Sequence, residues 1–169
     1  MFIETERLII KDFTMDMAQV VHENSLDEDT RRFVPDEVFE TVEDAAETIE
    51  FLMSCYDGSE GPFVYPVFTK TSGDNIGYVQ MVPLDDGNWE IGYHIAKRFT
   101  GNGYATEAVK AFIPVIAEKA GIKEVNGICL SENIASKCVL RKCGFEETSE
   151  GSGNYQGEER EIFKSVLKL

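Results

Sequence analysis

The chain of 169 residues lacks the features that mark several large classes of protein. No apolar run approaches the roughly 20 residues that a membrane-spanning helix needs. The four cysteines include no Cys-x-x-Cys pair, and neither His22 nor His94 stands at a metal-ligand spacing from a cysteine. The sequence therefore predicts a protein that is not attached to a membrane and holds no metal ion.

Basic side chains are also scarce, since 16 lysines and arginines stand against 31 aspartates and glutamates. The imbalance lies in residues 1–60, which hold 17 acidic and 4 basic side chains, whereas residues 61–169 hold 14 and 12. An acidic surface repels nucleic acid and anionic membranes, so we predict neither as a partner. The acidic part fits two roles: attraction of a cationic acceptor such as an amine, or solubility alone.

Nothing in the sequence divides the chain or addresses it to another compartment. Residues 1–10 hold acids and an arginine instead of a basic start and an apolar core, so we expect no signal peptide. Cys129 and Cys138 fall in apolar patterns and are expected in the core, which fits a reducing cytoplasm. There is no linker and no repeat, so residues 1–169 are expected to form one domain.

Hydrophobic periodicity predicts alternating strands and helices. Thr41 and Asp44 have the spacing of a capping box at the start of an amphipathic helix. The polar run 149–161 is expected to be a loop. The predicted strands lie near 7–11, 63–70, 75–84, 88–96, 124–130, 145–149 and 162–169, and the main helices near 16–24, 41–57, 104–120 and 133–143.

The most informative stretch is the loop that joins the strand ending at Ile95 to the helix 104–120. Gly101 and Gly103 allow backbone N–H groups to turn to one side without a Cβ clash. The first N–H groups of the following helix have no partner within the helix and carry the positive end of its dipole. Together these groups predict a main-chain site for a phosphate group.

Two common phosphate-binding motifs do not fit this loop. A P-loop requires a lysine after its last glycine, but Gly103 is followed by Tyr104. A dinucleotide fingerprint starting at Gly101 would need glycine or alanine at Thr106. The pattern Arg-x-x-Gly-x-Gly, from Arg98 to Gly103, instead resembles the pyrophosphate loop of the GNAT superfamily of N-acetyltransferases. An ordinary glycine-rich turn would have the same two glycines.

A second motif follows one helix and one strand later. Residues 133–145 resemble the GNAT pattern Asn-x-x-Ser-x-x-(Leu/Val)-x-x-Lys-x-Gly-Phe. Asn133 is a good N-cap and Gly144 a good C-cap, so a well-capped helix without chemistry would also fit. The two motifs in this order are more specific than either alone, and the order of elements along the chain is the GNAT order.

The resemblance implies an α/β (α+β) fold: one mixed, mostly antiparallel sheet of about seven strands with helices on both faces. It also implies acetyl-CoA as the cosubstrate, with no metal, and direct acetyl transfer to a primary amine. Among GNAT branches, the second motif is most similar to the RimJ/RimL-like acetyltransferases of ribosomal proteins. The donor-binding residues that the resemblance implies are Ile95, Ala96, Lys97, Arg98, Phe99, Gly101, Asn102, Gly103, Tyr104, Ala105, Asn133, Lys137 and Lys142.

One carboxylate, Glu90, and one imidazole, His94, are the candidates for accepting the amine proton. Glu90 is the first choice because it matches the family's glutamate on the strand beside the cleft. His94 is second: its intrinsic pKa is suitable, and it shares strand parity with Glu90, so both should face the same side. Glu90 as an ordinary solvated strand residue is the alternative.

The proton that the leaving sulfur gains needs a donor. Many GNAT enzymes use a tyrosine on the second-motif helix, but Leu140 occupies that position here. Ser136 matches a serine that is proposed to fill this role in the RimJ/RimL-like branch. A helix-surface serine would fit the sequence equally well.

The identity of the amine is left open by the sequence. An α-amine with a pKa of about 7.7–8.0 is easier to deprotonate than a lysine amine near 10.4, which favours a protein or peptide N-terminus. Polyamines and aminoglycosides are the alternative acceptors, since the acidic segment 27–50 suits cations. A non-catalytic acyl-CoA sensor is a further alternative, and the chain is expected to be a monomer or a homodimer.

Overall fold

The computed structural model describes residues 1–169 and contains one eight-stranded sheet, with strands in the order β1-β2-β3-β4-β5-β6-β8-β7. All neighbouring strands are antiparallel except β5 and β6, which are parallel. The strands are β1 (Phe2–Glu4), β2 (Leu8–Lys11), β3 (Phe63–Thr69), β4 (Asn75–Pro83), β5 (Trp89–Ile95), β6 (Glu124–Leu130), β7 (Glu146–Tyr155) and β8 (Glu158–Lys168).

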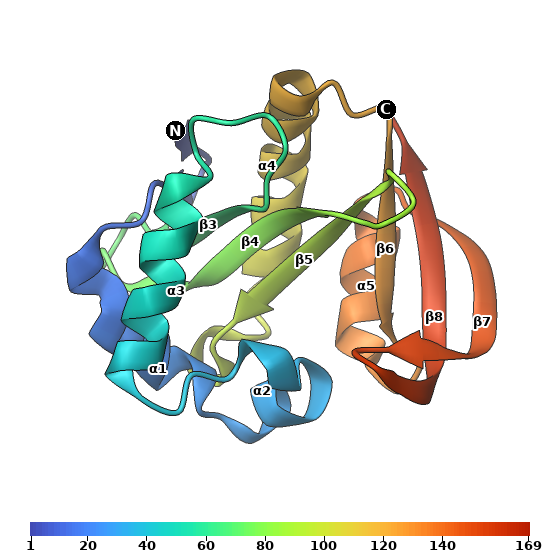
Figure 1. The fold of residues 1–169 in the computed structure, drawn as a ribbon, viewed down its shortest axis with the longest axis horizontal. Coiled ribbons are helices and arrows are strands. Elements are labelled where there is room, and N and C mark those ends of the chain that lie inside the picture. The colour runs from blue at the N-terminus through green and yellow to red at the C-terminus, as the bar shows by residue number, and fades with distance from the viewer.

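Helices cover both faces of this sheet. In Figure 1, α1 and α3 lie across the near face, and α4 and α5 lie behind it. The helices are α1 (Ala18–Ser25), α2 (Glu28–Phe33), α3 (Val42–Ser54), α4 (Tyr104–Ala120) and α5 (Ile134–Lys142), with short 3-10 helices η1 (Met15–Met17), η2 (Pro35–Glu37) and η3 (Lys97–Phe99). The predicted mixed, mostly antiparallel sheet with helices on both faces is confirmed. No helix is long and apolar enough to cross a lipid bilayer.

The sheet has eight strands, not the predicted seven or so. The additional strand, β1, pairs its three residues with β2 at the edge of the sheet. Three residues are too few for an alternating pattern to be recognised in the sequence.

The predicted loop 149–161 is also wrong, because β7 and β8 continue through it as a hairpin. β7 is an edge strand with mostly exposed side chains, so its polar sequence resembles a loop although its backbone is paired. Gln156 and Gly157 form the turn with φ of 53° and 86°, the positive values that a two-residue hairpin turn of type I′ requires.

Local sequence signals fix the helix ends. The predicted capping box is present in α3, where Thr41 accepts from the backbone N–H of Asp44 and Asp44 accepts from that of Thr41. Asn133 caps α5 by accepting from the N–H of Ser136 at 3.0 Å. Each such cap stabilises a helix by about 1 kcal/mol.

The core fills both sides of the sheet. Behind it, Phe112 and Ile116 of α4 are fully buried against Met81 of β4. In front, Ala45 and Ile49 of α3 pack in a smaller cluster. Each large buried side chain contributes about 1.5–3 kcal/mol, so the two layers hold β4 and β5 rigidly between them.

β5 and β6 separate soon after they meet. Their paired register contains only Glu90 opposite Asn126, and Figure 1 shows the two strands diverging from there. The gap is the place where a ligand can pass between strands that would otherwise be bonded to each other.

Candidate active site

A cavity of about 650 Å³ opens where β5 and β6 diverge. Side chains alternate along a strand, so Glu90, Gly92 and His94 of β5 face α2, while Tyr93 and Ile95 face α4 and α5. All five residues line the cavity. The cavity therefore has walls on both faces of the sheet, with a rear half toward α4 and α5 and a front half toward α2.

The rear half is bounded by the loop between β5 and α4. Gly101 and Gly103 have φ of 80° and 78°, as the phosphate-site prediction required. The N–H of Thr100 is bonded to Lys97 O at 3.2 Å, and that of Glu107 to Gly103 O at 3.1 Å. Between them, the backbone N–H groups of residues 101–106 donate no hydrogen bond within the protein. Consecutive unpaired donors at a helix N-terminus beside a cavity fit the two phosphates of a coenzyme A pyrophosphate.

Nine of the thirteen predicted donor-binding residues line the cavity, although the ammonium of Lys97 pairs with Asp29 of α2, on the front side. Those that line it are Ile95, Lys97, Phe99, Gly101, Gly103, Tyr104, Ala105, Asn133 and Lys142. Four of the predicted residues do not. The backbone N–H of Ala96 is bonded to Ile76 O, Arg98 stacks on the Phe99 ring, and Asn102 bonds back to carbonyls of its own loop.

Lys137 is the fourth predicted donor-binding residue outside the cavity. It is buried, its ammonium bonds to the Glu150 carboxylate of β7, and it lies 5.2 Å from the centre of the Phe163 ring. The side chain thus joins α5 to β7 and β8. The exposed Lys142, one turn further along α5, is the lysine of this helix that lines the cavity.

Ser136 lies on α5 at the rear wall and is paired with a tyrosine. Its Oγ is 2.7 Å from Tyr93 Oη, which also donates to the backbone carbonyl of Ser136 at 3.1 Å. Burial raises the pKa of Tyr93, so the phenol stays protonated at neutral pH. Because the phenol proton points to that carbonyl, the Ser136 hydroxyl is left to donate to Tyr93 Oη, and the two hydroxyls form a short hydrogen-bonded chain beside the cavity.

Glu90 faces the front half, and its environment differs from that of a solvated glutamate. Burial, and secondarily the charge of Asp36, raises the pKa of Glu90 to about 7. A carboxylate with this pKa is divided between its two protonation states near neutral pH, which suits a group that accepts and releases a proton.

His94 lines the same half but is engaged by α2. Its Nε2 is 2.7 Å from Thr30 Oγ1 and 3.8 Å from the carboxylate of Asp27. The nearby His94 imidazole, together with the hydrogen bond from the backbone N–H of Thr30, holds the pKa of the Asp27 carboxyl well below its usual range. Glu90 and His94 face the same side, as strand parity predicts. Three residues of strand stand between them, which puts their Cα atoms about 13 Å apart, so the two side chains do not act as one dyad.

The front half contains residues that the sequence analysis did not single out. Asp36 and Glu37, from η2, line the cavity, and burial raises the pKa of both carboxyls. Gln80 of β4 donates to Glu37 at 3.2 Å. The acidic segment 27–50 was the only sequence signal for them, and it did not indicate which of its carboxylates turn inward.

The tip of the β7–β8 hairpin closes over this half. Tyr155 Oη donates to the carbonyl of Phe33 at 2.7 Å, and Gln156 bonds to the carboxylate of Asp36. We call these two contacts the clasp. They join walls that lie 120 or more residues apart in the sequence, and they narrow the way in for an acceptor.

Cys138 differs from its predicted place. Cys129 is in the core as expected, whereas Cys138 is exposed and lines the cavity from α5. No group of three or more His, Cys, Asp or Glu side chains is arranged to hold a metal ion.

Comparison with known proteins decides the family. Residues 7–146 match the acetyltransferase (GNAT) domain. The chain belongs to the GNAT family. It is therefore an N-acetyltransferase that takes its acetyl group from acetyl-CoA, and the fit of the rear loop to a pyrophosphate agrees with that donor.

Solved structures share the fold over nearly their whole length, and a relative in sequence matches over most of its length. The uncharacterized N-acetyltransferase YnaD of Bacillus subtilis is 28% identical over 146 residues, covering 86% of this chain and 82% of that protein. RimL, the ribosomal L7/L12 α-N-protein acetyltransferase solved with coenzyme A, superposes with a TM-score of 0.85 at 16% identity, covering 100% of this chain and 98% of RimL. The microcin C7 self-immunity acetyltransferase MccE, solved with acetyl-CoA and AMP, gives 0.81 at 18% identity, covering 98% and 94%.

Proposed function

We propose that this GNAT enzyme acetylates the α-amine of a protein or peptide N-terminus, as in the RimJ/RimL-like branch. Glu90 accepts the proton of the amine, directly or through water, and Ser136 supplies a proton to the leaving sulfur. The observation that carries the proposal is the raised pKa of Glu90, about 7, in the front half of the cavity.

The magnitude of that pKa favours an α-amine over a lysine amine. A free α-amine has a pKa of about 7.7–8.0, roughly one unit above Glu90, whereas a lysine amine near 10.4 lies more than three units above it. Each unit costs about 1.4 kcal/mol of proton-transfer free energy. One carboxylate of this kind is therefore matched to the easier of the two deprotonations.

The donor half supports acetyl-CoA binding by main chain. We assign the pyrophosphate to the unpaired N–H groups of residues 101–106, and a further charge contact to Lys142. Ile95 and Asn133, which line the cavity beside the gap between β5 and β6, would hold the arm. When bound, acetyl-CoA supplies the activated acetyl thioester; the chain supplies its position and the two proton transfers.

The Ser136–Tyr93 pair supports the acid assignment. When Ser136 gives its proton to the thiolate, the phenol of Tyr93 can rotate and give its own proton to Ser136 Oγ, and the tyrosinate then regains a proton from solvent. Replacing Ser136 with Ala should slow the chemical step about ten-fold in single-turnover experiments. An unchanged chemical step would remove Ser136 from the mechanism.

The clasp limits the acceptor to one that is slender. The hydrogen bond from Tyr155 to the Phe33 carbonyl joins two walls of the front half, so we expect an extended chain end to enter more readily than a folded surface. A second candidate follows from the same feature: a small cationic amine, which the inward carboxylates Asp36, Glu37 and Glu90 would attract.

A panel of amines separates the candidates. It contains a short peptide with a free α-amine and no lysine, the same peptide blocked at its N-terminus but carrying one lysine, spermidine and an aminoglycoside. We expect amine-stimulated thiol release from acetyl-CoA to be fastest with the first peptide. Faster release with spermidine or the aminoglycoside would favour the second candidate, and binding of acetyl-CoA without release by any amine would favour a sensor.

A further inference from the structure

The first turn of α4, beside the phosphate loop, is fastened to the N-terminal segment of the chain. The carboxylate of Glu107 accepts from Thr5 Oγ1 at 2.6 Å, from the backbone N–H of Arg7 at 2.9 Å and from Arg7 Nε at 2.7 Å. A further contact joins Arg7 Nη2 to the same carboxylate at 2.6 Å. These bonds cross about a hundred residues of sequence, so they tie the start of the sheet to the start of α4.

The same guanidinium reaches into the loop itself. Arg7 Nη1 donates to the backbone carbonyl of Asn102 at 2.9 Å, and its Cζ lies 4.8 Å from the centre of the Tyr104 ring. Because a guanidinium is planar, with several donors in fixed directions, the three contacts set the position of the loop relative to α4. Arg7 does not line the cavity, so it acts on a ligand only through the loop.

The bond to Asn102 fixes the direction of the next N–H. In a trans peptide the C=O and the following N–H point in opposite directions. Holding the carbonyl of Asn102 toward Arg7 therefore turns the N–H of Gly103 away from Arg7. The same bond points the Asn102 carbonyl oxygen toward Arg7, so this oxygen does not repel an anion bound at the loop.

The carboxylate of Glu107 also needs a counter-charge. Burial opposes its ionisation, but hydrogen bonds from Thr5 and Arg7 hold the pKa of Glu107 below its ordinary value, so it is negative at neutral pH. Glu107 comes directly after residues 101–106, whose backbone N–H groups are unpaired. Without Arg7, a bare negative charge would stand one helical turn from the phosphates.

We propose that Arg7 and Glu107 are positioning residues for donor recognition: they hold the phosphate loop in its anion-binding geometry and cancel the charge next to it. The inference rests on the proposed assignment of the pyrophosphate to residues 101–106. It predicts that the pair serves the phosphate-bearing part of acetyl-CoA and contributes nothing to the acetyl-bearing end.

Two donors that differ in the phosphates provide the test. S-acetylpantetheine carries the same thioester and arm as acetyl-CoA but no pyrophosphate. For Arg7→Ala we expect kcat/KM with acetyl-CoA to fall about ten-fold, through KM, with kcat changed by less than about two-fold. The kcat/KM with S-acetylpantetheine should stay unchanged. Calorimetry should give a Kd for coenzyme A about ten-fold weaker than that of the wild type.

A purely structural role would give a different pattern. If Arg7 only stapled the fold, Arg7→Ala would lower kcat/KM for both donors by the same factor, and the proposal would be overturned. Arg7→Lys keeps the charge without the planar donor set, so it should give an intermediate Kd and a folded protein even if Arg7→Ala does not fold. Lys11→Ala removes a cation from β2 that stacks on Phe68 and does not line the cavity, and it should change neither donor constant.

A double variant tests the charge argument. In the Arg7→Ala background, Glu107→Gln removes the uncancelled charge, so the Kd for coenzyme A should recover by about three-fold. No recovery would overturn that part of the proposal. If the wild type itself bound coenzyme A no better than pantetheine, the pyrophosphate assignment would fail; if it did bind better and Arg7→Ala changed nothing, only the present inference would fail.

Discussion

The two halves of the cavity are built in different ways. The rear half presents backbone N–H groups from one continuous stretch, residues 101–106. The front half presents side chains from segments far apart in sequence: η2, β5 and the β7–β8 tip. Main-chain recognition needs a particular local conformation and little side-chain chemistry, so the donor site can be shared by many sequences. The acceptor site depends on individual side chains, so it is the part that sets specificity.

The first test of this comparison changes the backbone of the rear half alone. Gly103→Val places a β-branched side chain at φ of 78°, which turns the N–H groups away from the cavity. Because several charge-assisted bonds are lost together, the Kd for coenzyme A should weaken by about 100-fold or more. Gly87→Val, at φ of 83° in the β4–β5 turn, controls for backbone strain. Equal loss of binding in both variants would refute main-chain recognition.

The second test removes the base from the front half. Glu90→Gln should lower kcat/KM for the amine by about 100-fold and leave the Kd for coenzyme A unchanged. In the wild type, kcat/KM should rise with pH through about 7 as Glu90 loses its proton, and the variant should lack that rise. An unshifted pH profile in the variant would transfer the role to another group, with His94 next in order.

A third prediction uses stability, because Glu90 is held in an environment that favours its neutral form. Its pKa is raised from 4.5 to about 7 on folding, so the folded state binds the proton more tightly than the unfolded state. The contribution to stability is full below pH 4.5 and is lost as pH rises through 7. Between pH 5 and pH 8 the free energy of unfolding should therefore fall by about 2–3 kcal/mol more in the wild type than in Glu90→Gln. Parallel curves for the two proteins would contradict the raised pKa.

The smallest expected effect concerns the clasp and the selectivity between amines. Tyr155→Phe removes the bond to the Phe33 carbonyl, so bulkier amines should gain relative to the α-amine peptide by about three- to five-fold in kcat/KM. The KM for acetyl-CoA should not change. Tyr56→Phe is a matched control, because it removes a tyrosine bond to the carbonyl of Val64, at 2.8 Å, outside the cavity. A selectivity change in the control as well would rule out a special role for the clasp.

The same contrast explains how much the sequence reveals. Gly101, Gly103 and Asn133 indicate local backbone conformations, a left-handed loop and a helix cap, so these conformations of the proposed donor site were predictable. The parity of Glu90 and His94 was predictable for the same reason. The strand Leu8–Lys11 and the longer strands were predicted. β1 was missed because its three residues are too few to show an alternating pattern.

The remaining features depend on contacts between distant segments. Lys137 was assigned to the donor from its place on the helix of the second motif, but only the position of Glu150 on β7 shows where its ammonium lies. Cys138 has apolar neighbours in the sequence, which predicted a core position, but it lines the cavity in the structure. Asp36 belongs to a run of similar acids, and its inward position follows from the bond to Gln156, 120 residues away.

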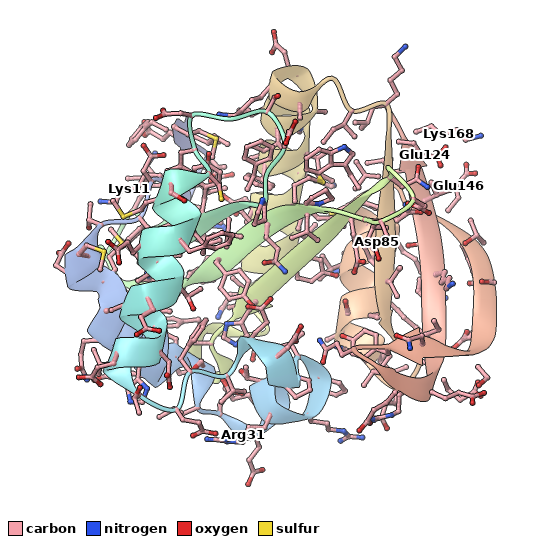
Figure 2. All side chains as sticks on the ribbon, in the orientation of Figure 1. Lys11, Arg31, Asp85, Glu124, Glu146 and Lys168 are labelled. Carbon is pink, nitrogen blue, oxygen red and sulfur yellow. The ribbon has the colours of Figure 1, made fainter.

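Several charged side chains lie away from both halves of the cavity. Arg31 on α2 points away from the sheet, and Glu124, Glu146 and Lys168 gather at the opposite end of the strands (Figure 2). Arg31 pairs with Glu40 at the surface, where such pairs contribute little. Substitutions at these positions therefore serve as neutral references for the experiments above.

The central claim is that free main-chain donors bind the pyrophosphate of coenzyme A, and amide NMR tests it most directly. Coenzyme A and pantetheine would each be added to the ¹⁵N-labelled enzyme, and the N–H resonances followed. We predict that the N–H resonances of residues 101–106 move downfield with coenzyme A and stay in place with pantetheine. Binding of coenzyme A with those six resonances unmoved would contradict the account.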